Sequence, residues 1–411
     1  MGSSGSHTSV PRDGVVVLVV PFPAQGHLNQ LLTFACVLEE HGLPVTRQAA
    51  HRFSGLDCTS LPNLRFHILS FPEFRNLPPD PEYPNKFPGH LQPVFDATEQ
   101  LLAPLTTLVC KLAGSHRSVV VVHDMLMSVA ARAAAECLNF ESYSYHCISA
   151  CSAVCFRRGE DDHPEPVVPG LSPPILRSFI NESFMDFLPR AVRFQHLDRG
   201  LLFNPSMPLK VMGPTVLLWK EHQEPHKFHE CLQWLDKKAQ QSVVYVAFGT
   251  IVSMRAVQVR ELAKGLEASG QPFLWVLRYA EKGDVFAGRE AEGPRGLPEG
   301  YEGKGLIVRD WAPQLEILRH PSTGGFFTHC GWNSCMESFT MGVPMVRWPM
   351  HSDQPVNVQL LTGVLGVGSA VKEWHERDDI VRTERVERAA VSKGGTSSTA
   401  FDSFLELISR P

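Results

Sequence analysis

The chain has 411 residues, of which 43% are hydrophobic and 20% charged, and its formal net charge at pH 7 is −5. This composition is typical of a soluble globular protein, and the length predicts two domains because single cores rarely grow so large. A negative net charge without a run of Lys and Arg argues against a nucleic-acid partner and against insertion into, or binding to, an anionic membrane.

The beginning of the chain and its cysteines predict a cytoplasmic protein. Residues 1–14 are polar and rich in Gly and Ser, so we expect a flexible tail and not a signal peptide. The ten cysteines form no C-x-x-C pair, and free thiols are typical of the reducing cytosol. Cys147, Cys151 and Cys155 have helical spacing, which we interpret as packing of small side chains and not as a metal site.

Strands alternate with helices in the first half of the chain. The elements predicted from apolar runs and periodicity are, in order, a strand at 15–20, a helix at about 28–41, a strand at 64–69, a helix at 93–112, a strand at 118–123 and a helix at 127–138. This βαβ order predicts a parallel sheet covered by helices. Residues 156–215 have weak periodicity, so we expect loops and short helices there and a linker at 213–225.

The same alternation starts again after the linker. The predicted elements are a strand at 242–248, a helix at 255–269, a strand at 272–278, a Gly-rich loop at 281–300, and short strands at 306–309, 326–329 and 345–348. The fold class is therefore predicted to be α/β, with two doubly wound domains that face each other across a cleft. Ligands of such sheets bind at the carboxyl ends of the strands, which is where the motifs below fall.

The sequence THCGWNS at 328–334 joins a predicted strand to a helix that starts near Asn333. A helix N-terminus presents free N–H groups and the positive end of the helix dipole, which suit a diphosphate. Gly331 allows the backbone to approach a ligand closely. Ser334 and Glu337 also match a capping box, which would give these two residues a structural role instead.

The motif is part of a longer ordered series between Trp311 and Gln354. The series contains WAPQ at 311–314, HCGWNS at 329–334, Glu337, and WPMHSDQP at 348–355. It resembles the signature box of plant secondary-product UDP-glycosyltransferases. The resemblance implies a GT-B fold of two facing Rossmann-like domains: an acceptor-binding domain at 1–218, with the tail 395–411 packing back on it, and a UDP-sugar-binding domain at 219–394.

The resemblance also implies a donor site residue by residue. The expected contacts are Trp311 and Ala312 with uracil, Gln314 and Glu337 with the ribose, His329, Asn333 and Ser334 with the phosphates, and Trp332, Asp353 and Gln354 with the sugar. Glutamine at position 354 accompanies glucose, so UDP-glucose is the expected donor. Thr250 follows a strand and is either a further phosphate contact or an ordinary loop residue, and Trp348 is interpreted as a core residue. No Asp-x-Asp follows an apolar strand, so we expect neither a metal nor a cofactor.

His27 follows the first predicted strand, and Asp124 ends the strand at 118–123 on the same edge of the sheet. Histidine titrates near neutral pH and can take a proton from a hydroxyl, while a carboxylate can orient it. Taken alone, His27 would be an ordinary loop histidine. The family uses such a pair, so the resemblance implies that His27 is the catalytic base, that Asp124 is its partner, and that the reaction inverts the anomeric carbon. The neighbouring His123 is expected on the opposite side of the strand.

The acceptor is the least defined part of the prediction. PFPAQGHLNQ at 21–30, VHDMLMS at 122–128 and KGDVF at 282–286 are similar to zeatin O-glucosyltransferases. A cytokinin such as zeatin or a flavonoid is therefore expected, although relatives that attack through a phenol ring carbon leave C-glucosylation open. The candidate wall residues of the acceptor pocket are His51, Phe71, Phe87, His90, Tyr145 and Phe184. The alternative for these residues is a solvated loop position or a core position.

Two other classes of protein compete with a transferase. An NAD-dependent oxidoreductase would carry G-x-G-x-x-G after its first strand, where this chain has PFPAQGH. A non-catalytic nucleotide-sugar-binding protein would not need the intact pair of His27 and Asp124. We expect a monomer whose partners are the donor and a small-molecule acceptor.

The chain departs from the family pattern in two stretches. The segment that follows Asn204 is shortened to 205–210, and past Val381 the helical run at 383–390 passes directly into 391–395. Neither stretch touches the expected nucleotide site, so the expected activity class is unaffected.

Overall fold

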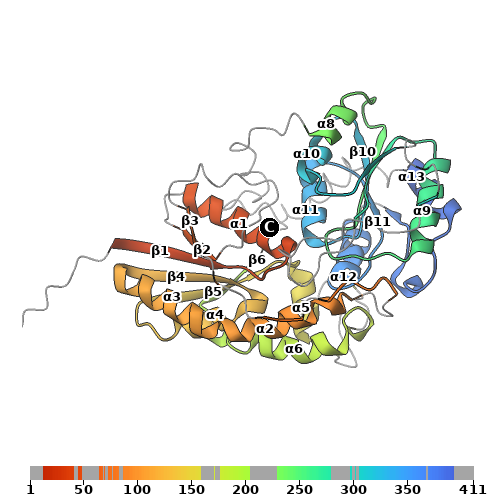
Figure 1. Cartoon of the computed structure of the whole chain (residues 1–411). Helices are drawn as coiled ribbons and strands as arrows, with labels where there is room; N and C mark the ends of the chain where they lie inside the picture. The colour runs from red at the N-terminus through yellow and green to blue at the C-terminus, as the bar shows by residue number, and fades with distance from the viewer. Residues whose placement is uncertain are drawn as a thin grey trace, which may run out of the picture.

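The computed structural model describes residues 13–40, 45–48, 64–67, 69, 73–75, 77–82, 87–158, 171, 176–203, 229–278, 297–298, 301, 305–366 and 369–392. These residues form two lobes, each built on a sheet with helices packed against it (Figure 1). We call the described residues up to 203 the first lobe and those from 229 onward the second lobe. The expected linker at 213–225, the shortened segment at 205–210, the loop at 281–300 in all but residues 297–298, and the tail at 395–411 lie outside the described residues.

The first lobe contains a parallel sheet of order β3-β2-β1-β4-β5-β6. Its strands are β1 (Asp13–Val20), β2 (Val45–Gln48), β3 (Leu64–His67), β4 (His116–Asp124), β5 (Phe140–His146) and β6 (Gly200–Phe203). The predicted strands at 15–20, 64–69 and 118–123 are confirmed as β1, β3 and β4. Continuous β-branched runs form β1 and β4 because both strands are central and are buried between layers of helices.

The helices of the first lobe are α1 (Gln25–Glu40), α2 (Gln92–Ala97), α3 (Leu102–Ser115), α4 (Val129–Ala134), α5 (Ala150–Arg158) and α6 (Glu182–Val192). The helical stretch predicted at 93–112 is confirmed, with a short 3-10 turn at Thr98–Leu101 between α2 and α3. Among its described residues, the weakly periodic stretch from 156 contains the helix α6, which packs Phe187 and Ala191 into the core.

The second lobe contains a parallel sheet of order β12-β11-β10-β7-β8-β9. Its strands are β7 (Val243–Ala247), β8 (Phe273–Val276), β9 (Leu306–Val308), β10 (Thr323–Thr328), β11 (Met345–Arg347) and β12 (Ser369–Ala370). Its helices are α8 (Glu230–Leu235), α9 (Ala256–Ala268), α10 (Gln314–Arg319), α11 (Trp332–Met341), α12 (Gln354–Gln359) and α13 (Thr383–Ser392). The predicted strands and the helix at 255–269 are confirmed within a few residues.

Both sheets have the strand order of a doubly wound Rossmann fold, 3-2-1-4-5-6, counted from the first strand of each lobe. The order reverses between β1 and β4 in the first lobe and between β7 and β10 in the second lobe. Crevices at such switch points are where open α/β sheets bind ligands. The predicted α/β class with two doubly wound units is confirmed, while the boundary between residues 218 and 219 lies outside the described residues and stays a prediction.

Apolar contacts join the two lobes. Val356 of α12 is fully buried within the core cluster of the first lobe, and Leu360, Val364 and Trp374 of the second lobe pack against the same cluster. The lobes therefore share a contact that includes buried apolar side chains. Among the described residues, none of the helices has both the length and the apolar composition needed to cross a membrane.

Candidate functional site

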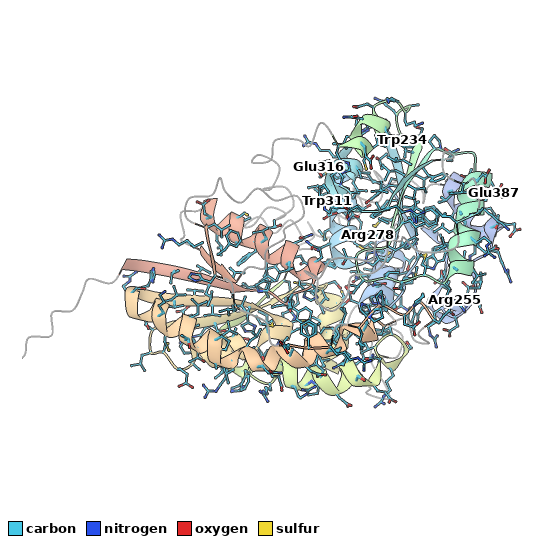
Figure 2. All side chains as sticks on the ribbon, in the orientation of Figure 1. Trp234, Arg255, Arg278, Trp311, Glu316 and Glu387 are labelled. Atoms are coloured by element: carbon cyan, nitrogen blue, oxygen red, sulfur yellow. The ribbon has the colours of Figure 1, made fainter. Side chains whose placement is uncertain are left out.

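A cavity of about 320 Å³ lies between the two lobes, at the carboxyl ends of their central strands. The second lobe contributes every residue that was expected to bind the UDP-sugar, namely Thr250, Trp311, Ala312, Gln314, His329, Trp332, Asn333, Ser334, Glu337, Asp353 and Gln354. His27 lines the cavity from the first lobe, and Asp124 lies directly behind it. Trp311 and Arg278 are labelled on this side of the second lobe in Figure 2. Sequence reasoning missed Arg278, which lines the cavity just past β8.

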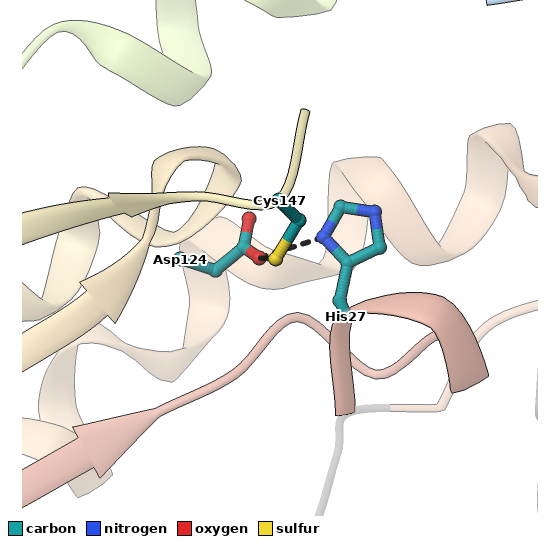
Figure 3. Close-up of side chains that lie close together, drawn as sticks. All are labelled: His27, Asp124 and Cys147. Carbon is teal, nitrogen blue, oxygen red and sulfur yellow. Dashed lines mark hydrogen bonds and ion pairs between the residues drawn. The ribbon is translucent and has the colours of Figure 1, made fainter. Parts of the chain in front are cut away.

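His27 and Asp124 form a hydrogen-bonded pair (Figure 3). The Nδ1 atom of His27 lies 2.6 Å from Oδ2 of Asp124, and the side chain of Asp124 is fully buried while that of His27 is 25% exposed. Burial opposes ionisation of the imidazole, but the charge and hydrogen bond of Asp124, together with the charge of Asp353, outweigh it and raise the pKa of His27 above 6.5. The pair therefore consists of a base that faces the cavity and a carboxylate that orients it.

The carboxylate of Asp124 is held from three directions. Burial alone would raise the pKa of Asp124. Three neighbours outweigh burial and lower the pKa below 3.8, namely His27 through its charge and hydrogen bond, the backbone N–H of Leu126, and the thiol of Cys147. Oδ1 accepts the N–H of Leu126 at 2.9 Å, and Oδ2 accepts the thiol of Cys147 at 3.3 Å. Because an ionised carboxylate is acceptor-only, Nδ1 of His27 carries a proton and Nε2 is left as the free basic nitrogen.

The interpretation of Cys147 as a packing residue is confirmed, because it belongs to a buried apolar cluster of the first lobe. Its helical spacing is not, because Cys147 follows β5 directly and precedes α5, so it does not share a helix with Cys151 and Cys155. Those two residues pack against the core of the first lobe, as expected. The thiol of Cys147 also lines the cavity and donates to Asp124, and burial together with the charge of Asp124 raises its pKa well above the usual value. Its position at a strand end, beside the residues expected to be catalytic, was the available signal.

The three side chains of this cluster were also considered as a metal site. Their potential ligand atoms lie within 4.8 Å of one another. The distance of 2.6 Å between Nδ1 of His27 and Oδ2 of Asp124 is, however, that of a hydrogen bond. Two ligands of a tetrahedral Zn²⁺ at about 2.0 Å are separated by about 3.3 Å. The geometry therefore fits a hydrogen-bonded pair better than it fits two ligands of one ion.

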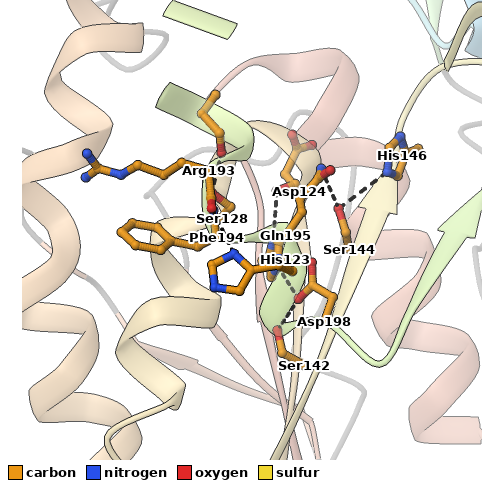
Figure 4. A network of polar contacts seen from close by, with 12 residues as sticks. His123, Asp124, Ser128, Ser142, Ser144, His146, Arg193, Phe194, Gln195 and Asp198 are labelled. Carbon is orange, nitrogen blue, oxygen red and sulfur yellow. Dashed lines mark hydrogen bonds and ion pairs between the residues drawn. The ribbon is translucent and has the colours of Figure 1, made fainter. Parts of the chain in front are cut away.

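His123 lies on the other face of β4, as expected (Figure 4). Its Nδ1 lies 2.8 Å from the backbone oxygen of Asp124, and its Nε2 lies 3.0 Å from Oδ1 of Asp198. Ser142 of β5 donates a second hydrogen bond of 2.6 Å to the same oxygen of Asp198. All of these groups are buried, so the network supports the strand end that carries Asp124 without reaching the cavity.

The helix α11 begins at Trp332, one residue before the expected start, with Gly331 as its N-cap and without a side-chain cap. The capping-box alternative for Ser334 and Glu337 is therefore wrong, because Ser334 is already the third residue of the helix. The N–H groups in the first turn of a helix have no acceptor within the helix, which suits an anionic ligand. The amide of Asn333 donates to the backbone oxygen of Gly26 at 3.0 Å and so joins this turn to the first lobe.

The ring of His329 lies between two glycines. A Cβ atom at Gly249 or at Gly331 would come within 2.6 or 2.5 Å of Nε2 of His329, so both positions require glycine. Gly249 also has a φ of +76°, which favours glycine on conformational grounds. Burial lowers the pKa of His329 to about 4, so the ring is neutral at pH 7 and can donate one hydrogen bond.

Gln314 and Glu337, the residues expected at the ribose, are bonded to each other. Nε2 of Gln314 donates to Oε2 of Glu337 at 2.7 Å and to Oγ of Ser334 at 3.2 Å, while its Oε1 accepts the hydroxyl of Tyr245 at 3.2 Å. Burial raises the pKa of Glu337 to about 7, against the opposing effect of the hydrogen bond from Gln314. The geometry places a carboxyl and an amide side by side in the cavity wall, which suits vicinal hydroxyls.

Asp353 and Gln354, the residues expected at the sugar, are buried at the start of α12. Burial raises the pKa of Asp353 to about 6, and a hydrogen bond of 2.7 Å from Asn357 opposes this rise. Oε1 of Gln354 accepts the backbone N–H groups of Met350 and His351 at 2.8 and 3.0 Å. Because this oxygen already holds the preceding loop, the expected contact of Gln354 with the sugar falls to its Nε2 atom.

The acceptor side of the cavity is aromatic. Phe22, Phe87, Phe95, Phe184 and His351 line it, so the candidates Phe87 and Phe184 are confirmed as wall residues. Sequence reasoning missed His351, whose pKa is lowered to about 3 by burial and by the nearby His329 and His90.

The remaining candidates do not line the cavity. Tyr145 belongs to a core cluster, which was the alternative for it, and Trp348 belongs to another, as expected. His90 is buried beside the cavity and is neither a solvated residue nor a wall residue. His51 and Phe71 lie outside the described residues.

The chain matches known families and structures over most of its length. Residues 13–223 match the N-terminal domain of glycosyltransferases, and residues 204–381 match the family described as UDP-glucoronosyl and UDP-glucosyl transferase. The chain is 42% identical to a zeatin O-glucosyltransferase of Phaseolus lunatus, over 92% of this chain and 88% of the relative. It is 40% identical to a zeatin O-xylosyltransferase of Phaseolus vulgaris, over 91% and 88% of the two chains.

A solved structure confirms the GT-B architecture. Phytolacca americana UGT2, complexed with UDP-2fluoro-glucose and pterostilbene, is similar with a TM-score of 0.69 and 26% identity, over 97% of this chain and 94% of that chain. The strand orders, the cavity at both switch points and these matches lead to one assignment. The chain belongs to the UDP-glucoronosyl and UDP-glucosyl transferase family and is a UDP-glycosyltransferase, with zeatin O-glucosyltransferase and O-xylosyltransferase among its relatives.

Proposed function

We propose that this enzyme transfers glucose from UDP-glucose to a hydroxyl of a small, largely apolar acceptor and inverts the configuration of the anomeric carbon. One observation carries the proposal: His27 with its buried carboxylate lines the same cavity as the N-terminus of α11. A base for the acceptor thus lies in one lobe, and an anion site for the leaving group lies in the other.

The reaction proceeds by direct displacement. Nε2 of His27 takes the proton of the acceptor hydroxyl, the oxygen forms a bond to the anomeric carbon, and the bond from that carbon to the diphosphate oxygen breaks. Asp124 stabilises the imidazolium that results, because its carboxylate is already bonded to Nδ1. The developing negative charge on UDP is stabilised by the N–H groups at the start of α11 and by the ring of His329. The transferred proton leaves with solvent after product release.

The donor sugar follows from the residues at the start of α12. Asp353 accepts from two sugar hydroxyls, and Gln354 donates through Nε2, since its oxygen is occupied by the loop before it. Glutamine at this position favours glucose over galactose. Because one relative is a zeatin O-xylosyltransferase, the donor panel includes UDP-xylose and UDP-galactose beside UDP-glucose.

The acceptor is proposed from the aromatic walls and from the relatives. Phe22, Phe87, Phe95 and Phe184 offer flat apolar surface near His27, which suits the ring system of a cytokinin or a flavonoid. Zeatin is the first choice because relatives named for zeatin are 42% and 40% identical to this chain.

The proposal is tested by supplying the three donors with trans-zeatin, cis-zeatin and a dihydroxyflavone and by measuring UDP release and products. UDP release with UDP-glucose and formation of an acid-labile β-glucoside are expected. An acid-stable product would show attack through a ring carbon instead of oxygen. If no acceptor of the panel releases UDP, while UDP still binds, a nucleotide-sugar-binding protein replaces the transferase.

Replacing the proposed base separates catalysis from binding. His27→Ala is expected to lower kcat by about 10²–10⁴-fold, because general base catalysis contributes about that much. The affinity for UDP, measured by calorimetry, is expected to stay within about twofold, since the residues proposed to bind UDP lie in the second lobe. His375→Ala, which changes an exposed histidine outside the cavity, serves as the matched control. A His27→Ala enzyme that keeps most of its turnover would show that another group is the base.

A further inference from the structure

Asn357 of α12 is fully buried at the interface of the two lobes, and its side chain has no part in the chemistry described above. Its amide lies beside groups from both lobes. An amide offers two N–H donors and one carbonyl acceptor, and each of them is occupied here. A buried polar group that is satisfied so completely has one orientation only.

The two N–H groups of this amide bond to residues of the proposed UDP-sugar site. Nδ2 of Asn357 donates to Oδ2 of Asp353 at 2.7 Å and to the backbone oxygen of Cys330 at 3.0 Å. Cys330 has a φ of +63°, a conformation that residues other than glycine adopt rarely, and it lies just before Gly331 and the N-terminus of α11. One side chain therefore holds the carboxylate proposed for the sugar and the strained turn proposed for the phosphates.

The carbonyl oxygen of the amide bonds to residues of the first lobe. Oδ1 of Asn357 lies 2.9 Å from Oγ of Ser149 and 3.1 Å from Oγ of Ser152, and both hydroxyls are buried. The backbone N–H of Ser152 also bonds to Oγ of Ser149 at 3.1 Å, so the two serines are fixed at the start of α5. The orientation of Asn357 thus depends on the position of the first lobe.

We propose that Asn357 is a positioning residue that couples the docking of the two lobes to the orientation of Asp353 at the donor sugar. The proposal rests on the proposed function, in which Asp353 accepts hydroxyls of the sugar. Ser149 and Ser152 anchor the amide oxygen to the acceptor lobe, and the amide nitrogen then holds Asp353 ionised and in place. The loss of this hydrogen bond leaves Asp353 buried with weaker support for its charged form, which is the form that accepts two hydroxyls.

The competing explanation is that Asn357 merely fastens the lobes together. A second side-chain hydrogen bond between the lobes separates the two explanations, because Nε1 of Trp374 donates to Oγ of Ser178 at 2.9 Å and neither residue lines the cavity. Ser178→Ala therefore removes an interlobe hydrogen bond of the same kind without touching the donor site. It serves as the matched control.

The test compares Asn357→Leu, which keeps the number and branching of the side-chain heavy atoms, with the double variant Ser149→Ala/Ser152→Ala and with Ser178→Ala. For Asn357→Leu we expect kcat/KM for UDP-glucose to fall about tenfold or more. The Kd of UDP, which has no sugar and depends only on the turn at Cys330, is expected to rise by a clearly smaller factor. The double variant is expected to show the same split with a smaller loss, because Asp353 keeps its hydrogen bond from Asn357. Ser178→Ala is expected to match the wild type.

The outcomes are distinguishable from a failure of the proposed function, which would appear as absent UDP release by the wild type. Unchanged kcat/KM in Asn357→Leu, an equal loss of UDP and UDP-glucose binding, or the same loss in Ser178→Ala would each overturn the proposal. If Asn357→Leu does not fold, the serine double variant decides alone, since it leaves Asn357 in place. In that case wild-type kcat/KM in the double variant is the overturning result.

Discussion

A catalytic base must be neutral when the acceptor arrives, and the environment of His27 sets the pH at which this holds. Burial lowers the pKa of His27, the charge of Asp124 and its hydrogen bond raise it more strongly, and the result lies above 6.5. As the pH falls through this raised pKa, His27 takes up a proton and can no longer accept one from the hydroxyl. In the wild type, kcat/KM is therefore expected to fall toward acid pH with an apparent pKa above 6.5, and this fall is called the acid limb below.

Asp124→Asn tests this electrostatic coupling. Removing the carboxylate charge removes the effect that raises the pKa of His27, so the acid limb is expected to move to lower pH. The plateau rate is expected to fall by about 10²-fold or more, because the imidazolium loses its counterion. The measurement is kcat/KM between about pH 5 and 9, with Asp96→Asn, which alters an exposed carboxylate paired with Arg190, as the control. An acid limb of the pH profile that stays at the same pH or moves to higher pH would contradict the coupling between Asp124 and His27.

At the scale of elements, the turn between β10 and α11 determines whether the donor site is open. His329 fills the space that side chains at Gly249 and Gly331 would otherwise occupy. Gly331→Ala places a Cβ about 2.5 Å from Nε2 of His329, so the ring must move away from the phosphate site. The affinity for UDP is expected to fall about tenfold or more, as for the loss of a hydrogen bond to a charged group.

Calorimetric titration with UDP checks the effect of Gly331→Ala. Gly114→Ala is the control, because a Cβ at Gly114, in the last turn of α3, meets no atom within 4 Å. Wild-type affinity in Gly331→Ala would show that His329 is not needed in its present position.

The long central strands and the ordered motif series were predictable, while short elements and helix starts were not. Continuous apolar runs identify β1, β4 and β7 because these strands are buried on both faces. In contrast, β2 contains Thr, Arg and Gln, and its strand conformation depends on pairing with β1 and β3, which are distant in sequence. The capping-box pattern failed because α11 starts two residues before Ser334, and the pattern alone cannot place a helix start.

The residues expected to bind the donor lie together, whereas their partners were not expected. Those assigned from the motif between Trp311 and Gln354 all line the cavity. The contacts of Cys147 and Asn357 join residues that are 23 and 208 positions apart in sequence, respectively. Such pairs arise from the docking of strand ends and lobes, so a single sequence can suggest a strand end, as for Cys147, but not the contact itself.

At the scale of the whole molecule, the proposed nucleotide contacts lie in the second lobe, and the proposed base lies in the first. A ligand that binds the folded state stabilises it, by about 2.7 kcal/mol at about 100 times its Kd. UDP at that concentration is expected to raise the Tm of the second lobe by about 5 °C or more. Differential scanning calorimetry measures this shift, with adenosine diphosphate as the control nucleotide. An unchanged Tm with UDP would argue against the cavity as the nucleotide site.

Two of the hydrogen bonds that join the lobes end on the backbone of the first lobe. Asn333 donates to the oxygen of Gly26, and the N–H of Ser352 donates to the oxygen of Phe179. Main-chain oxygens persist through almost any substitution, so these contacts place little demand on the side chains that surround the acceptor. At these two contacts the first lobe can therefore vary its side chains and still dock on the second lobe. Exchange of whole first lobes between relatives is, on this basis, a practical route to new acceptor ranges.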